Sequence, residues 1–322
     1  MCERNWGTAL ASTGVKPMRD PSLRIIYLDT NLWNRLLEQN IDPTRLLEEL
    51  KLNNANLAIS GHTVYELAKT FRRSPDKAKK LFHYVRKYVD AGIIFARDNM
   101  EQLHGEVEAL MKGASTVVAF YAPDGVEYNK LQEEVAKLSE GIVDEQALQF
   151  MTNRQQFAQG TRAAQKTHLD GKPETTDQLK SVPDAQFPAW LGNEVVSESG
   201  IGLLVGHLLR MYSDIPLGTA KQVAQPLLQI PPSRISKGLV RADLYYNWRC
   251  ASRGSNPSDL LDDIYHVLNA SYCDIYATAE VGQDNYASLL LDPWTKVAIY
   301  DSKTAVDEWL LALAGAKATI AS

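Results

Sequence analysis

Acidic residues stand at four places in this chain where a predicted strand ends or a predicted helix begins. Asp29 comes directly after the apolar run 25–28, and Glu66 lies in the first turns of the helix that follows a second apolar run. A helix near 259–271 opens with three acids, and a further acid follows the strand predicted at 273–278. The three acids are Asp259, Asp262 and Asp263; the further one is Glu280, with Asp274 and Asp284 as alternatives. Acids also stabilise helix starts, so a structural role accounts for one or two of them.

Several carboxylates gathered at one place would favour a bound cation. Two like unit charges about 4 Å apart repel by roughly 4 kcal/mol at an effective dielectric constant near 20. Such a cluster persists only when some acids hold a proton or when a cation lies between them. Carboxylate oxygens select Mg²⁺ or Mn²⁺, and these ions assist the hydrolysis of phosphodiesters. The acids therefore predict metal-dependent phosphodiester hydrolysis, in which Asn31 and Thr278 position water or the ligating carboxylates.

The predicted elements would bring these acids to one edge of a sheet. Strands are predicted at 24–28, 56–60, 92–95, 273–278 and 296–300, and helical patterns separate them. This alternation favours an α/β fold with a central, mostly parallel sheet and helices on both faces. Ligands of such sheets bind at the carboxyl ends of the strands. The acids expected to meet at that edge are Asp29, Glu66, Asp263 and Glu280.

The chain divides into four predicted parts. Residues 1–22 form a flexible tail, and 23–98 form the first part of the sheet core. Strand patterns fade in 99–240, which is predicted to be a helical insertion, and 241–322 complete the core. A glycine-rich run at 200–206 follows no predicted strand, so it is not interpreted as a dinucleotide-binding loop.

Composition and charge argue against several classes of protein. The chain has 322 residues, of which 45% are hydrophobic and 23% charged, as in ordinary globular proteins. A net charge of -5 argues against a protein that coats nucleic acid without specificity. The three cysteines form neither a metal-ligand spacing nor an even disulfide set, which favours a reducing, cytoplasmic setting. No signal peptide and no membrane-spanning run is predicted.

The order and spacing of these motifs resemble the PIN domain of metal-dependent nucleases. The motifs are Leu28-Asp29-Thr30-Asn31, Ile59-Ser60 with Glu66, Asp263-Ile264-Tyr265-His266, and Tyr272 to Thr278 followed by Glu280. The resemblance covers 23–96 and 255–315 and implies a three-layer α/β/α sandwich, to which the insertion is added. It implies that Asp29, Glu66 and Asp263 bind Mg²⁺ or Mn²⁺, and that Glu280 assists where the family usually has Asp. It further implies an endoribonuclease that acts on single-stranded RNA.

Cationic residues supply candidate contacts to nucleic acid. Between 69 and 87, eight Lys and Arg residues accompany a single acid, although the whole chain is acidic. Phosphate contacts need such cations, and a solvated helix surface is the alternative interpretation. In a second basic segment, 234–253, the aromatic residues Tyr245, Tyr246 and Trp248 would either stack on bases or pack in the core. The candidate contacts are Arg72, Arg73, Lys77, Lys80, Arg249 and Arg253.

A second class of function is compatible with the same residues. Glu280 stands where the PIN family usually has Asp, and the insertion is large. Both features also suit a catalytically inactive PIN-like scaffold that binds RNA or protein through the insertion. His266 is interpreted as a packed histidine or as a residue that orients Asp263. DNA as the substrate, a homo-oligomer and a protein inhibitor are open alternatives.

Overall fold

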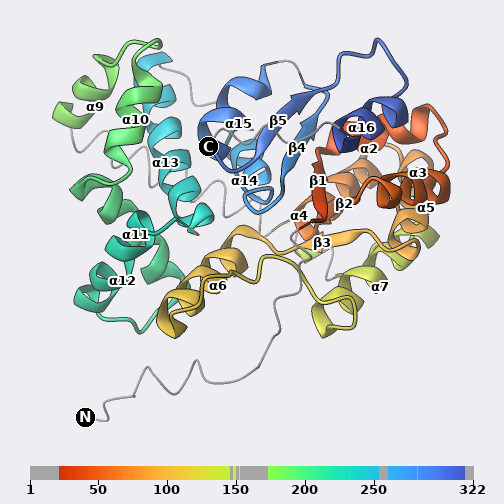
Figure 1. Cartoon of the computed structure of the whole chain (residues 1–322), viewed down its shortest axis with the longest axis horizontal. Coiled ribbons are helices and arrows are strands. Elements are labelled where there is room, and N and C mark those ends of the chain that lie inside the picture. Colours follow the sequence, from red (N-terminus) through yellow and green to blue (C-terminus); the bar gives the residue numbers. More distant parts are fainter. Residues whose placement is uncertain are drawn as a thin grey trace.

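A five-stranded, all-parallel sheet lies at the centre of the described residues (Figure 1). The computed structural model describes residues 22–145, 148–149, 152, 173–231, 233–253, 260–280 and 282–315. The strands are β1 (Arg24–Leu28), β2 (Ala55–Ser60), β3 (Ile94–Ala96), β4 (Ile275–Thr278) and β5 (Lys296–Ile299). Their order in the sheet is β3-β2-β1-β4-β5. The predicted α/β class with a parallel sheet is therefore confirmed.

Helices account for most of the remaining described chain. The amino-terminal half contributes α2 (Thr30–Glu38), α3 (Pro43–Leu52), α4 (Gly61–Ala68), the 3₁₀ helix η1 (Lys69–Arg72), α5 (Pro75–Asp90), α6 (Asn99–Lys112) and α7 (Val126–Glu140). The rest are α9 (Pro173–Lys180), α10 (Phe187–Glu194), α11 (Glu198–Met211), α12 (Leu217–Gln229), α13 (Arg234–Arg253), α14 (Leu260–Leu268), α15 (Gln283–Leu291) and α16 (Val306–Gly315). Among the described residues, no helix combines the length and the apolar character needed to cross a bilayer.

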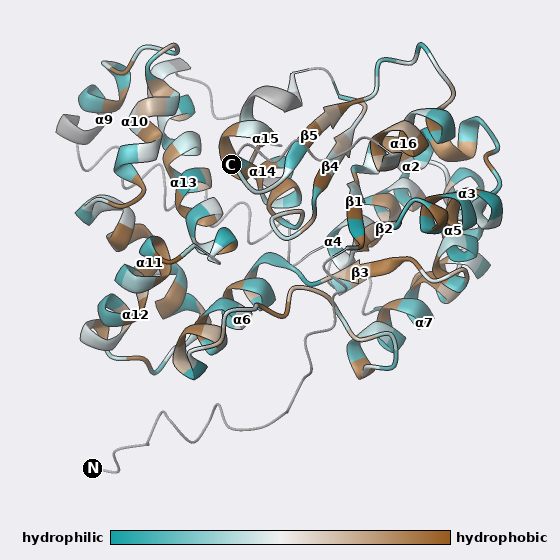
Figure 2. Ribbon diagram, in the orientation of Figure 1, coloured by the Kyte–Doolittle hydropathy of each residue, from teal (hydrophilic) through white to brown (hydrophobic). Residues whose placement is uncertain are grey.

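Helices cover both faces of the sheet, which gives the sandwich three layers. Successive strand residues point to opposite faces, so Ile25 and Tyr27 enter one core whereas Ile26 and Leu28 enter the other. The first core lies against α6, α13, α14 and α15, and it continues into α10, α11 and α12. The second lies against α2, α3, α5 and α16. Figure 2 shows hydrophobic residues along the strands and more hydrophilic ones on α3 and α5.

Local sequence signals explain where the helices near the sheet begin and end. Asp29 and Ser60 are the N-caps of α2 and α4, and their side chains accept backbone N–H groups of the first turn. Asp98 and Glu101 form a capping box at the start of α6. The same helix ends at Gly113, whose φ of 63° suits glycine. The strands therefore pass directly into capped helices, which holds the strand ends in place.

The structure shifts some predicted bounds by a few residues. The third strand begins at Ile94 rather than at 92, because Gly92 adopts a φ of 89° that ends the preceding turn. The proposed boundary between 240 and 241 lies inside α13. The glycine-rich run 200–206 belongs to α11, so it forms no phosphate-binding loop. The tail 1–21 lies outside the described residues.

Candidate functional site

The strand order creates a topological switch point between β1 and β4. From β1 the chain moves to β2 and β3 on one side, and β4 and β5 lie on the other side. Crevices at the carboxyl ends of two such strands are the usual ligand sites of open α/β sheets. Asp29 follows β1, and Thr278 ends β4. These two side chains therefore occupy the position at which a ligand is expected.

Asp29 is buried and held by groups from α2 and β4. Its Oδ1 accepts the backbone N–H of Thr30 at 2.6 Å, and its Oδ2 accepts the Thr278 hydroxyl at 2.9 Å. The Asn31 amide lies 3.4 Å from the same Oδ2. Only 4% of Asp29 is exposed. These contacts leave the carboxylate a single orientation, and they agree with the positioning roles predicted for Asn31 and Thr278.

Glu66 reaches the same place from α4. Its Oε2 accepts the Thr30 hydroxyl at 2.7 Å, so one residue connects Glu66 with the cap made by Asp29. Lys69 lies 3.6 Å from its Oε1. The start of α4 is fixed by Tyr27, whose hydroxyl bonds Ser60 at 2.7 Å and Thr63 at 2.8 Å. Glu66 is therefore oriented directly by the Thr30 hydroxyl of α2, while Tyr27 of β1 fixes the start of its helix.

Asp263 and Glu280 complete the group of acids predicted from the sequence. Burial, followed by the charges of Glu280 and Glu66, raises the pKa of Asp263 to about 7. Burial and the charges of Asp29 and Glu66 also raise the pKa of Glu280, although its side chain is exposed. Its backbone N–H donates to Thr278 Oγ1 at 3.1 Å. Because the charges of Asp29 and Glu66 act on both Asp263 and Glu280, the four acids share one electrostatic environment. We call Asp29, Glu66, Asp263 and Glu280 the carboxylate cluster.

His266 is packed, with 1% of its surface exposed, as one of the two interpretations from the sequence predicted. The sequence did not indicate that it lies between two other acids. Its Nε2 is 3.4 Å from Asp29 Oδ1, and its Nδ1 is 3.5 Å from Glu66 Oε2. Burial lowers the pKa of His266, but the interaction with Asp29 and the nearby negative charges raise it further than burial lowers it. The net pKa lies above the usual histidine value.

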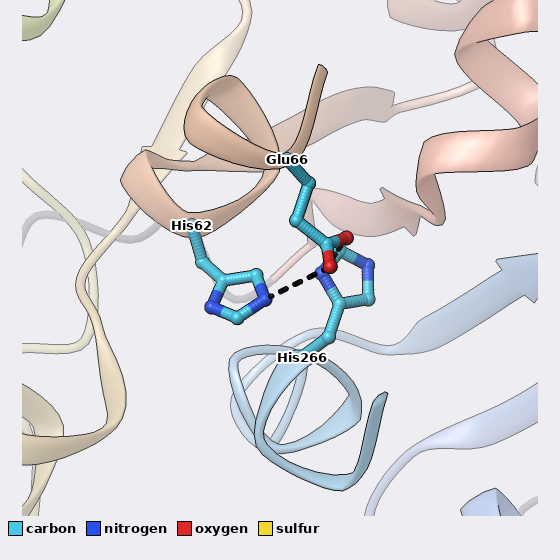
Figure 3. A group of neighbouring side chains, drawn as sticks. All are labelled: His62, Glu66 and His266. Atoms are coloured by element: carbon cyan, nitrogen blue, oxygen red, sulfur yellow. Dashed lines mark ion pairs between the residues drawn. The ribbon is translucent and has the colours of Figure 1, made fainter. Parts of the chain in front are cut away.

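His62 joins this group without any prediction from the sequence. It lies one turn before Glu66 on α4, and its Nε2 is 3.6 Å from Glu66 Oε1. The rings of His62 and His266 are 5.1 Å apart between centroids. The His62-x-x-x-Glu66 and Asp263-x-x-His266 spacings were the available signals, because each places two polar groups on one helical face. Figure 3 shows His62, Glu66 and His266 pointing toward one another from α4 and α14. We call these three residues the imidazole group.

The alternative acids are placed elsewhere or are not described. Asp274 precedes β4 and accepts the backbone N–H of Ile25 at 2.7 Å, at the amino end of the sheet. It is therefore not the fourth acid of the carboxylate cluster. Asp259 lies outside the described residues, as do the side chains of Asp262 and Asp284.

The predicted nucleic-acid contacts fall into two groups. Arg72 and Arg73 are exposed at the end of η1, and Lys77 and Lys80 are exposed on α5. Arg249 is half-buried on α13, and the side chain of Arg253 lies outside the described part. Tyr245, Tyr246 and Trp248 are buried, and Trp248 stacks on Phe187 with 4.2 Å between centroids. The core interpretation of these aromatics is therefore confirmed.

The side chains at the switch point fit a divalent cation. The carboxylate cluster offers oxygen donors of the type that Mg²⁺ and Mn²⁺ prefer. Within the described residues, neither ring nitrogen of the buried His266 has a hydrogen-bond partner, although both face carboxylates. Burial and neighbouring negative charges raise the pKa values of Asp263 and Glu280, and a cation would relieve the part due to those charges.

Comparison with known proteins provides no independent assignment. No protein-family model matches the chain, and no curated protein or solved structure matches it. The resemblance to the PIN domain therefore stays a prediction. Because one fold supports many activities, the function is argued below from the chemistry of the site.

Proposed function

We propose that the protein is a metal-dependent, PIN-like nuclease that hydrolyses phosphodiester bonds in single-stranded RNA. The observation that supports this proposal is the convergence of the carboxylate cluster at the β1–β4 switch point. Asp29 and Glu66 are joined there through Thr30. Besides burial, the charges of Asp29 and Glu66 raise the pKa of both Asp263 and Glu280. Capping of α2 accounts for Asp29, whereas a bound cation would account for the gathering of all four acids.

The carboxylate cluster would hold one or two Mg²⁺ or Mn²⁺ ions. A bound ion of this kind lowers the pKa of water and stabilises charge on the phosphate oxygens. The residues of the chain supply orientation. Thr278 and the Thr30 backbone direct the two oxygens of Asp29, and the Thr30 hydroxyl directs Glu66. Preorganised ligands of this kind reduce the reorganisation needed during reaction.

The exposed cations of η1 and α5 support a polyanionic substrate. Lys69 lies 3.6 Å from Glu66, so the cationic segment begins beside the carboxylate cluster. Arg72, Arg73 and Lys77 follow on the surface, and none of them forms an ion pair with a described residue. Phosphates of a single strand could therefore pair with them while one phosphodiester lies at the acids.

Cleavage of labelled single-stranded RNA and DNA tests the proposal directly. We expect cleavage in Mn²⁺ or Mg²⁺, none in EDTA, and a loss of at least about 100-fold in Asp29→Asn, because removing a ligand charge removes transition-state stabilisation. Asp124→Asn is the matched control, since Asp124 is exposed in a loop. Equal cleavage by wild type and Asp29→Asn would contradict the assigned role. No cleavage of either polymer would favour the inactive scaffold.

A further inference from the structure

The imidazole group has the composition of a transition-metal site. His62 and Glu66 come from one face of α4, and His266 comes from α14. One ligand atom from each lies within 4.8 Å of the other two. From these side chains we infer a second metal site, beside the carboxylate cluster, that binds a divalent transition-metal ion such as Zn²⁺ rather than Mg²⁺.

The distances suit a single ion. A tetrahedral ion with ligands at about 2.1 Å separates its ligand atoms by roughly 3.4 Å. His62 Nε2 lies 3.6 Å from Glu66 Oε1, and His266 Nδ1 lies 3.5 Å from Glu66 Oε2. Both contacts are longer than a good hydrogen bond. Three donors converging at such spacing leave a position that an ion can fill after small side-chain adjustments.

The environment of His266 points to a ligand independently of these distances. Its two ring nitrogens are buried and lack a hydrogen-bond partner among the described residues. Buried polar groups without a partner are uncommon and call for an explanation. His266 Nδ1 faces Glu66, and its Nε2 lies 3.4 Å from Asp29 Oδ1. A carboxylate behind the second nitrogen is the usual support of a metal-ligating histidine.

The donor set discriminates between metals. Two imidazoles and one Glu, with a further position open, match the ligands of catalytic zinc sites. Imidazole nitrogen suits zinc and its neighbours in the first transition row, whereas Mg²⁺ prefers six oxygen ligands. The carboxylate cluster retains three acids outside the imidazole group. The switch point can therefore hold two ions of different preference, which share Glu66.

A pocket borders this site at His62. A cavity of about 360 Å³ lies between α4, α7 and the start of α6, and His62 and Tyr65 form part of its wall. Its charged lining consists of Asp98, Glu101, Glu127, Glu133 and Glu134 together with Lys130 and Lys137. Acids outnumber lysines there, which favours the approach of a cation to His62.

Both sites use Glu66, so the inference refines the proposed function. A catalytic role of the zinc site rests on that proposed function. Metal binding itself can be measured without RNA. Failure of the inference and failure of the nuclease proposal are thus distinguishable: the first appears in metal titrations, the second in Asp29-dependent cleavage.

The test is calorimetric titration of metal-free full-length protein with Zn²⁺ in excess Mg²⁺. We expect one saturable equivalent of Zn²⁺ that excess Mg²⁺ does not displace. His62→Gln and His266→Gln should weaken it about tenfold or more, since even residues behind the ligands change affinity by about 10- to 100-fold. His83→Gln is the matched control, because His83 is exposed on α5 and far in sequence from the imidazole group.

X-ray absorption of the Zn²⁺-loaded wild type reports the ligands without any substitution. Scattering from two imidazoles would support the site, even if His266→Gln failed to fold. Oxygen ligands alone, or no saturable Zn²⁺ binding in excess Mg²⁺, would overturn the inference. His266 would then act as a fixed cationic partner of Asp29 and Glu66. Unchanged affinity in a folded His62→Gln variant would overturn it as well.

Discussion

At the residue scale, the site combines several neighbouring acids with one buried imidazole, that of His266. Asp29 and Glu66 face the two nitrogens of His266 at 3.4 and 3.5 Å. Asp263 forms no ion pair with a described residue. Burial with the charges of Glu280 and Glu66 raises its pKa to about 7, although the charge of His266 lowers that pKa. Without a metal ion, Asp263 therefore prefers its protonated form over a wide range of pH.

This raised pKa predicts a pH-dependent effect of Asp263→Asn on stability. Because the pKa is 3.8 unfolded and about 7 folded, protonation stabilises the folded state fully below the lower value. That contribution is lost progressively as pH rises through about 7. In EDTA, the free energy of unfolding of Asp263→Asn relative to that of wild type should therefore rise by about 1 to 2 kcal/mol from pH 5 to pH 8. This figure is reduced because Asp263 is partly exposed.

Urea unfolding at the two pH values measures this difference. The raised pKa of His266 acts in the same direction. Asp263 is one cause of that rise, so the comparison removes only the part that Asp29 and Glu66 cause. Asp124→Asn provides the control for loss of an exposed acid. Equal changes in the free energy of unfolding of wild type and Asp263→Asn between pH 5 and pH 8 would show that the pKa of Asp263 is not raised.

At the element scale, a buried carboxylate joins α6 to α13. Glu106 on α6 is 1% exposed and accepts the backbone N–H groups of Ile235 at 2.7 Å and Ser236 at 3.0 Å. It also accepts the hydroxyls of Ser236 and Tyr272. The first N–H groups of a helix lack partners within the helix and carry a partial positive charge. Glu106 therefore caps α13 from a distant part of the chain.

We expect Glu106→Gln to destabilise the protein by about 2 to 3 kcal/mol. The amide group offers one acceptor oxygen, and its NH₂ would face buried donors that then have no acceptor. Denaturant unfolding at pH 8, where the carboxylate is ionised, measures the loss. Glu108→Gln on the same helix is the control, because Glu108 pairs only with partly exposed cations and should change stability by less than about 1 kcal/mol. Equal losses would contradict the capping role.

Elements near the sheet were predictable because their signals are local. The apolar run before Asp29, the Ser60 cap and the apolar run of β4 each act within a few residues. The acids could then be placed at one edge by the rule for parallel strands. The imidazole group was not predictable, because α4 meets α14 only through the strand order β2-β1-β4. A buried histidine in a helix has the same local pattern whether it packs in a core or faces two carboxylates.

At the scale of the whole molecule, charge is distributed unevenly. The chain carries a net charge of -5, yet exposed cations follow Glu66 through η1 and α5. Such a local patch attracts a polyanion despite an acidic total. The carboxylate cluster lies next to it, and a bound cation would lower the local negative charge that a phosphate must approach.

Substitution of Lys77 and Lys80 together by Ala should weaken single-stranded RNA binding and lower its salt dependence. Each lost phosphate contact on a single strand reduces the slope of log affinity against log salt by about 0.7, so the pair should reduce it by roughly 1.4. Fluorescence anisotropy in Ca²⁺, across a salt series, measures both quantities. The double variant of Lys221 and Lys296 is the control, because these lysines are exposed on α12 and at the amino end of β5. An unchanged slope would show that Lys77 and Lys80 of α5 do not contact the RNA phosphates.

The pairing of β1 with β4 also governs when the site can form during protein synthesis. Asp29 and its partner Thr278 are separated by 249 residues, which a ribosome adds in roughly 12 to 50 s. Of its two neighbours in the sheet, β1 has only β2 available for most of that interval, and Asp263 and His266 are added shortly before β4. The proposed site is therefore incomplete until residues 263–280 have been added.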